Sequence, residues 1–141
     1  MGFSLIAATA IIGASMLVAL TVLTGGILPT MTEFRDSYSN MKDRAINRVQ
    51  TDIDITSAST SPNASNYDLN FTLNNTGSTT LKTSDFTVLI NGTSQPFSCS
   101  LEYIYFENAA YFYVYNLNGT GTKKLKVVTD NGISGYYEYI A

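Results

Sequence analysis

Histidine and tryptophan are absent from this chain of 141 residues, and cysteine occurs only once. A single cysteine cannot form a disulfide within the chain, so the fold does not depend on the bridges that stabilise many small secreted domains. Zinc sites need clusters of cysteine and histidine, and nucleophilic catalysis needs a base that is most often histidine. No lysine has a suggestive context, and no phosphate-binding glycine loop follows a strand. The composition therefore predicts a protein that is not an enzyme and that uses no metal and no cofactor.

Charge is scarce as well. Charged residues make up 13% of the chain, about half the usual share, and the formal net charge is −3. The basic residues form no patch in the second half of the chain, which argues against a nucleic acid as partner. Asparagine, serine, threonine and tyrosine are abundant instead. The surface is therefore expected to owe its solubility to hydroxyl and amide groups.

Two sites, one at Cys99 and one at Asp52 and Asp54, could still carry chemistry. Cys99 lies in a predicted strand, where it would act as a small buried hydrophobe; a reactive thiol or a bridge between molecules is the alternative. Asp52 and Asp54 share one face of a predicted strand and could help to hold calcium. The simpler interpretation places both carboxylates in solvent, beside a junction between helix and strand.

Residues 3–28 form an uncharged apolar run. As a helix this run would extend about 39 Å, enough to cross a hydrocarbon core of about 30 Å. It is too long for a cleaved signal peptide and has no basic residue before it, so we expect a retained helix. The helix is either a plain lipid-spanning anchor or also packs against sister helices through its small residues. The residues predicted to make these contacts are Phe3, Leu5, Ile6, Ala10, Ile11, Gly13, Leu17, Leu20 and Leu23.

Four basic residues, Arg35, Lys42, Arg44 and Arg48, follow the apolar run. The positive-inside rule would place this side of the membrane in the cytoplasm. The features of the second half of the chain favour export, so the sequence gives two conflicting indications of topology.

The next segment, residues 31–49, has apolar residues at alternating spacings of three and four. This pattern predicts a narrow seam on one face of a helix, which would pack on a neighbouring helix or on the flank of the following domain. Together with the apolar run it predicts one helical region of about 50 residues, softened by Gly25 and Gly26 and bent at Pro29. The residues assigned to the seam are Phe34, Tyr38, Met41, Ala45 and Val49.

After Asp52 the apolar period becomes two, which indicates β-strands. Residues 67–73 alternate with the odd positions inward, and residues 86–90 show a second such face. Turn signals occur at 61–63, 75–78, 91–92, 118–121 and 130–132. The chain is thus predicted to be α+β, with a helical region at 1–52 followed by an Ig-like antiparallel β-sandwich at 53–141.

Residues 103–115, YIYFENAAYFYVY, are predicted to form a hairpin that is apolar on both faces. One face would fill the core and the other would remain as an exposed aromatic contact surface, unless the domain itself covers both faces. The tyrosines of this candidate surface are Tyr103, Tyr105, Tyr111, Tyr113 and Tyr115.

Five N-glycosylation sequons occur, all after the helical region. One of them, at Asn70, falls in the middle of a predicted strand, whereas the other four are candidates for glycan attachment on an exported domain. These four are Asn63, Asn74, Asn91 and Asn118.

Several motifs in one order resemble the archaeal flagellin-like accessory proteins of the archaellum, the FlaF and FlaG family, with the greater likeness to FlaF. The motifs are MGFS at 1–4, TAII at 9–12, RVQTDIDIT at 48–56, LNNTGSTTL at 73–81, VLING at 88–92 and KVVTDNGI at 126–133. This family is related to archaellins and type IV pilins. The chain lacks the basic leader and the mature start of archaellins, which argues against a main filament subunit. This argument does not hold if Met1 is a processed N-terminus.

The resemblance implies a non-enzymatic protein of the cell envelope. Its N-terminal helix would lie in the cytoplasmic membrane or in a filament core, and its sandwich would be extracellular. Implied partners are a surface-layer protein, other archaellum subunits and further copies of the chain, and the implied role is that of a static motor element. A pilin-like filament subunit and a membrane-anchored carbohydrate-binding sandwich are the alternatives.

Overall fold

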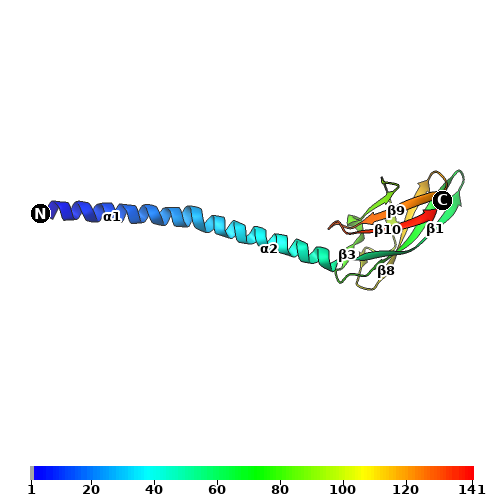
Figure 1. Ribbon diagram of the computed structural model, residues 1–141, viewed down its shortest axis with the longest axis horizontal. Coiled ribbons are helices and arrows are strands. Elements are labelled where there is room, and N and C mark those ends of the chain that lie inside the picture. The colour runs from blue at the N-terminus through cyan, green and yellow to red at the C-terminus, as the bar shows by residue number, and fades with distance from the viewer. Residues whose placement is uncertain (1) are drawn as a thin grey trace. The chain divides into compact units, whose positions relative to one another are not determined.

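The computed structural model describes residues 2–141, so Met1, with which the first family motif opens, lies outside the described residues. The described chain divides into two compact units, of which the first ends at Asp43 and the second comprises Arg44–Ala141. The first unit is helical, whereas the second contains the end of a helix and all of the strands (Figure 1). The predicted α+β class is confirmed.

The helical region runs without a break through α1 (Gly2–Val22), η1 (Leu23–Ile27) and α2 (Leu28–Gln50). The short η1 segment is a wider π-helical turn, which the amide of Leu28 closes on the carbonyl of Leu23. It ends two residues before Pro29, whose ring has no N–H and collides with the carbonyl one turn earlier in a regular helix. A widened turn gives the ring room, so the predicted irregularity takes the form of a π turn.

The strands of the second unit form two four-stranded antiparallel sheets and one short pair. The first sheet has the order β1 (Ile53–Asn63), β2 (Asn66–Asn75), β8 (Ala109–Leu117) and β6 (Ser98–Cys99). The second has the order β10 (Ser134–Ile140), β9 (Thr122–Val128), β4 (Thr87–Ile90) and β5 (Thr93–Gln95). The short pair joins β3 (Leu81–Lys82) to β7 (Tyr103–Ile104), and the 3-10 turn η2 (Thr83–Asp85) follows β3.

The core lies between the two large sheets and follows the predicted alternation. Every second residue of β2 from Tyr67 to Leu73 is buried, as are Val88 and Ile90 of β4. Phe112 of β8 lies at the centre of an aromatic cluster, with ring centroids 5.0 Å from Phe71, 5.9 Å from Phe86 and 5.6 Å from Phe97. Cys99 is half-buried and packs against this core.

The first turn follows the predicted turn at 61–63 instead of coinciding with it. Asn63 and Asn66 are the last pair of the β1–β2 ladder, so the turn consists of Ala64 and Ser65, with Ala64 at a φ of 53°. The prediction was wrong because Pro62 was taken as a turn residue. Proline is tolerated in β1 because β1 is an edge strand of its sheet.

The predicted hairpin at 103–115 is also wrong. β7 pairs with β3, whereas β8 pairs with β2 and β6, so the two halves of the aromatic run lie in different sheets. The connection between them is held by Asn75 instead. The amide of Asn75 donates to the carbonyl of Asn108 at 3.0 Å, and the amide of Glu107 donates to the carbonyl of Asn75 at 3.0 Å.

Candidate interaction surfaces

The helical region presents its apolar side chains outward. None of residues 2–50 is buried, and all nine residues predicted to pack in the membrane or against other helices are exposed. Among the described residues, Gly2–Gln50 is long and apolar enough to include a membrane span. Gly13 lies in a shallow apolar hollow of about 430 Å³ that includes Leu17, Leu20 and Leu23. These contacts remain predictions, but the side chains are free to make them.

The predicted seam lies on α2 and is exposed along its length. Phe34, Tyr38 and Met41 belong to the helical unit, whereas Ala45 and Val49 belong to the sandwich unit. Val49 is 86% exposed, so the sandwich does not cover this end of the seam. Packing of the seam on a neighbouring helix remains a prediction.

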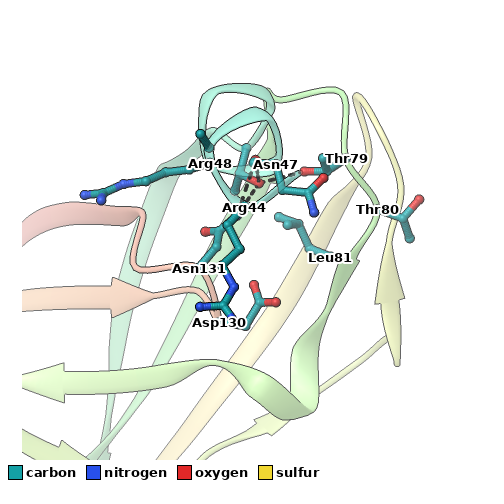
Figure 2. Close-up of a pocket in the computed structure, with 10 residues that line it drawn as sticks. Arg44, Asn47, Arg48, Thr79, Thr80, Leu81, Asp130 and Asn131 are labelled. Atoms are coloured by element: carbon teal, nitrogen blue, oxygen red, sulfur yellow. Dashed lines mark hydrogen bonds between the residues drawn. The ribbon is translucent and has the colours of Figure 1, made fainter. Parts of the chain in front are cut away.

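Hydrogen bonds connect the last turn of α2 to the sandwich (Figure 2). The buried Thr51 hydroxyl donates to the Asn47 carbonyl at 2.8 Å and lies 2.8 Å from the Thr79 hydroxyl. Asn131 Nδ2 donates to Thr51 Oγ1 at 2.6 Å, and Asn131 Oδ1 accepts the Thr129 hydroxyl at 2.7 Å. Side chains from three separate segments thus meet at one point.

The loop after β2 makes a second set of contacts with the same helix end. The amides of Thr76 and Gly77 donate to the Asp52 carbonyl, and the amide of Ser78 donates to the Gln50 carbonyl at 2.8 Å. The Thr76 hydroxyl donates to an Asp52 carboxylate oxygen at 2.9 Å. A Cβ atom on Gly77 would overlap the backbone of Gln50 and Asp52, so only glycine fits there. We call this region, residues 50–52 with the loop 75–79 and the turn 129–131, the junction.

Asn75 holds the junction loop from inside the domain. Its side chain is fully buried, and Nδ2 donates to the carbonyls of Thr79 at 2.7 Å and Ile104 at 3.0 Å. Its Oδ1 accepts the amide of Gly77 at 3.1 Å. A buried amide with its donors and acceptor paired rigidifies the loop that it contacts. Asn75 and Asn131 stood in predicted turns, but no sequence signal assigned them this structural role.

An open hollow of about 900 Å³, with both polar and apolar residues in its lining, lies beside the junction. Figure 2 shows Arg44 directed toward Asp130 within it, whereas Arg48 points away. The hollow mixes both signs of charge and leads to solvent, so it does not select a ligand of one charge.

Three of the five candidate tyrosines share one face. Tyr111, Tyr113 and Tyr115 alternate along β8 with buried residues, and we call these three the tyrosine strip. Thr72 of β2 lies opposite Tyr111, and Asn70 lies opposite Tyr113, so uncharged polar groups flank the strip. Tyr103 and Tyr105 are exposed but belong to β7 and to the loop after it.

Three sequons lie at the end of the sandwich remote from the junction, which we call the distal end. β1 and β8 run from the junction toward this end, and β9 returns from it. Asn63 lies at the end of β1, and Asn91 and Asn118 line one hollow of about 400 Å³. By contrast, Asn70 lies within β2, and Asn74 has a buried side-chain oxygen without a hydrogen-bond partner among the described residues.

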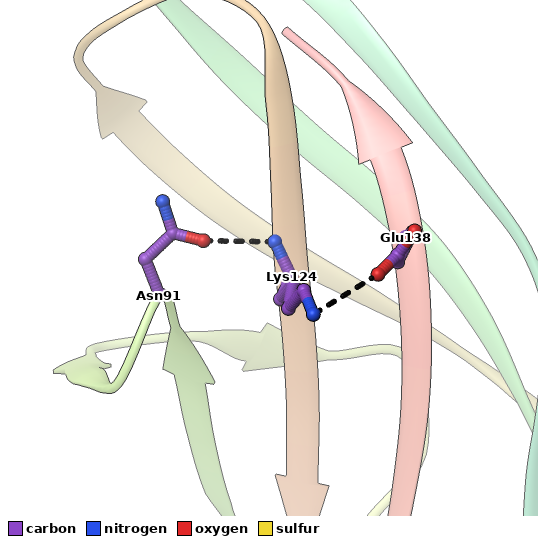
Figure 3. Close-up of polar contacts among 3 residues, drawn as sticks. All are labelled: Asn91, Lys124 and Glu138. Carbon is purple, nitrogen blue, oxygen red and sulfur yellow. Dashed lines mark hydrogen bonds and ion pairs between the residues drawn. The ribbon is translucent and has the colours of Figure 1, made fainter.

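The side chain of Asn91 is hydrogen-bonded through its oxygen (Figure 3). Its Oδ1 accepts the backbone amide of Lys124 at 2.9 Å. Glycans are attached at Nδ2, which has no hydrogen-bond partner within residues 2–141. Asn63 differs, because its Nδ2 donates to both carboxylate oxygens of Asp68, at 3.2 and 3.3 Å.

Two tyrosines have perturbed pKa values. Burial, followed by the hydrogen bond to the Tyr67 hydroxyl at 2.9 Å, raises the pKa of Tyr139 well above its ordinary value. On the opposite, exposed face of β10, hydrogen bonds from Ser134 and then Lys126 lower the pKa of Tyr136. No group of three acidic, histidine or cysteine residues that could hold a metal occurs among residues 2–141.

Comparison with known proteins gives a family and a fold. The archaeal-type flagellin family profile matches residues 2–139. A search of curated proteins finds no match. The archaellum periplasmic stator protein FlaG from Sulfolobus acidocaldarius is similar in structure, with a TM-score of 0.54 and 20% identity over 63% of this chain and 99% of that one. A chain of the stator protein complex of FlaF and FlaG from the same organism gives 0.50 and 20%, over 62% and 87%.

Proposed function

The chain belongs to the archaeal-type flagellin family, and we propose that it is a static, non-enzymatic component of the archaellum. Its N-terminal helix would be held in the cytoplasmic membrane, and its sandwich would bind the surface layer outside the cell. A rotating filament needs a part that does not turn, and such a part must be held at both ends. The two similar structures carry the description of periplasmic stator proteins, which supports this role as a proposal for the present chain.

The junction is the observation that carries the proposal. A static element bears load between its two attachment points. A freely rotating linker between helix and sandwich would not transmit torque from one to the other. Here the residues that link them, Gln50 and Asp52, are bonded to the loop 75–79, and Thr51 is bonded to Thr79 and Asn131. Gly77 packs against this backbone without room for a side chain. The link is therefore part of the folded domain.

The tyrosine strip is the surface proposed for binding. Tyrosine supplies rigid, amphipathic contact area, and neighbouring serine, threonine and asparagine side chains supply adaptable hydrogen bonds. The strip has this composition, with Thr72 and Asn70 opposite its tyrosines. The proposed glycans at Asn63, Asn91 and Asn118 would lie at the distal end and leave this face uncovered.

The test measures binding of the sandwich unit, Arg44–Ala141, to isolated surface layer in a sedimentation assay. We expect the unit to sediment with the layer and a triple variant with Tyr111, Tyr113 and Tyr115 changed to serine to lose at least about tenfold in affinity. Tyr136→Ser is the matched control, since Tyr136 is 66% exposed on the other sheet. A folded unit that does not sediment would count against the proposal. Binding lost after the layer's sugars are oxidised would indicate carbohydrate recognition.

A pilin-like filament subunit is the second candidate function. The fully exposed apolar surface of α1, with the hollow at Gly13, suits packing against copies of the same helix. Mass spectrometry of sheared appendages decides between the two, because a filament subunit would be their bulk component and a static element would be nearly absent.

The orientation in the membrane is a separate proposal, since Arg35 and Lys42 follow the apolar run. Protease treatment of intact cells should reach the sandwich. A sandwich that is digested only after lysis would reverse the proposed topology.

A further inference from the structure

One face of α2 in the helical unit is left exposed by residues 2–141. Met31, Phe34, Tyr38 and Met41 follow one another at spacings of three, four and three, so they form a stripe on one side of the helix. All four are exposed, Phe34 by 74%. This stripe has the geometry of the contact line of a two-helix coiled coil. We call it the apolar stripe.

The charges around the apolar stripe are sorted by sign. Arg35 follows Phe34 by one position and Lys42 follows Met41 by one, so both basic side chains border the stripe. Glu33, Asp36 and Asp43 fall on the remaining faces of the helix. In coiled coils the bordering positions form the ion pairs that select the partner. Here these positions carry positive charge and no negative charge.

A second copy of the chain does not supply the missing carboxylates. In a parallel pair Arg35 would meet Thr30 of the other copy, and Lys42 would meet Ser37. In an antiparallel pair the basic residues of the two copies would border the same side of the contact and repel each other. Neither arrangement pairs a basic border residue with an acidic one.

We infer that the apolar stripe binds an amphipathic helix of a different protein, one whose own apolar stripe is bordered by glutamate or aspartate. Such a helix would cover Phe34, Tyr38 and Met41 and would pair with Arg35 and Lys42. The inference does not rest on surface-layer binding, which concerns the other unit. The inference predicts that this part of α2 forms a contact between two different proteins.

The test uses the full chain in detergent micelles and three fluorescent helical peptides, with binding followed by anisotropy. Two designed peptides share one apolar stripe and differ only in glutamate or lysine at the bordering positions; the third has the sequence of residues 28–50. We expect the glutamate peptide to bind at least about tenfold more tightly than the lysine peptide at low salt. This ratio should shrink in about 0.5 M salt, where the screening length is only a few ångströms.

Charge-reversal variants of the full chain sharpen the test. Arg35→Glu with Lys42→Glu should invert the preference between the glutamate and lysine peptides. Asp36→Lys with Asp43→Lys is the matched control, because these residues lie on other faces of the helix and should leave the preference in place. Circular dichroism of each variant checks that the helix and the sandwich are retained.

Three results would overturn the inference. The peptide of residues 28–50 could bind as tightly as the glutamate peptide, the two designed peptides could bind equally, or none of the three could bind. Tyr38→Cys in a Cys99→Ser background provides an independent measurement. Efficient disulfide formation between two copies through position 38 would show that a second copy occupies the stripe.

Discussion

The helical unit and the sandwich unit use apolar side chains in opposite ways. Along α1 the apolar residues cover every side of the helix, and all of them are exposed, whereas in β2 each apolar residue is followed by an outward polar one. A helix that is apolar all round has no stable state in water and needs lipid or other helices around it. The sandwich encloses its own core. The helical unit therefore depends on its surroundings, whereas the sandwich unit does not.

The largest expected effect is that of Gly77→Ala, which tests whether the junction belongs to the self-contained unit. The added Cβ would overlap the backbone of Gln50 and Asp52, so we expect a loss of at least about 4 kcal/mol in the free energy of unfolding. Guanidinium unfolding followed by tyrosine fluorescence measures it. The control is Gly92→Ala, where φ is +84° but the space is open, with an expected loss of about 1 kcal/mol. Equal losses in the two variants would contradict the packing at the junction.

Two adjacent residues of β8 distinguish the inner from the outer face of the sandwich. Phe112→Ala removes the central ring of the aromatic cluster and should cost about 3–5 kcal/mol of unfolding free energy. Tyr113→Ala changes the outer face and should cost less than about 1 kcal/mol. The reverse order in thermal or guanidinium unfolding would mean that the strand register is shifted by one residue.

Leu20→Arg should affect the helical unit and leave the sandwich unit unchanged. A central arginine adds about 2.5–3.5 kcal/mol to the free energy of membrane insertion, so the variant should shift to the soluble fraction on carbonate extraction. The melting temperature of the sandwich should not change, because Leu20 belongs to the helical unit. Leu20→Met serves as control and should remain with the membrane. Unchanged membrane retention of Leu20→Arg would oppose the lipid anchor and favour a protein environment for α1.

High pH should weaken the sandwich through Tyr139. Because burial and the Tyr67 hydroxyl raise the pKa of Tyr139, its contribution to stability is complete below the ordinary tyrosine pKa of about 10 and is lost as the pH rises beyond it. Tyr139→Phe should cost about 1 kcal/mol at pH 7 and flatten this decline. Unfolding curves at pH 7 and above pH 10 measure both effects, with Tyr136→Phe as an exposed control. A decline of unchanged slope in Tyr139→Phe would assign the pH effect to another group.

The smallest effect concerns the outer surface of the second sheet (Figure 3). Lys124 Nζ lies 3.3 Å from Glu138 Oε1, with side chains 76% and 62% exposed. Exposed pairs of this kind contribute about 0.5 kcal/mol or less, and salt screens them. A double-mutant cycle with alanine at both positions should give a coupling energy within that limit. A larger, salt-independent value would show that this face is covered by a partner.

Periodicity in the sequence predicted the parts of the fold that depend on short-range order. The odd positions of 67–73 are buried as predicted, β10 has the predicted bounds of 134–140, and the turn at Asn91 and Gly92 has both residues at positive φ. Each of these features follows from side-chain alternation or from the conformational preference of one or two residues.

Pairing between distant strands was not predictable in the same way. The residues 103–108 contain enough apolar side chains for a hairpin, but the loop that they form is determined by Asn75, which lies about thirty residues earlier in the chain. Which strands become neighbours depends on such long-range contacts, and these leave no periodic signal. The junction could not be predicted for the same reason. No local sequence pattern indicates the contacts among Thr51, Thr79 and Asn131.

The sequence Thr76-Gly77-Ser78 would ordinarily mark a pliable stretch that is open to solvent. In this protein, three consecutive amide protons there are already donated to the chain. Deuterium should therefore replace these protons slowly, at rates typical of a core strand. A protease should likewise find no open loop at residues 76–78, so this part of the junction should resist cleavage.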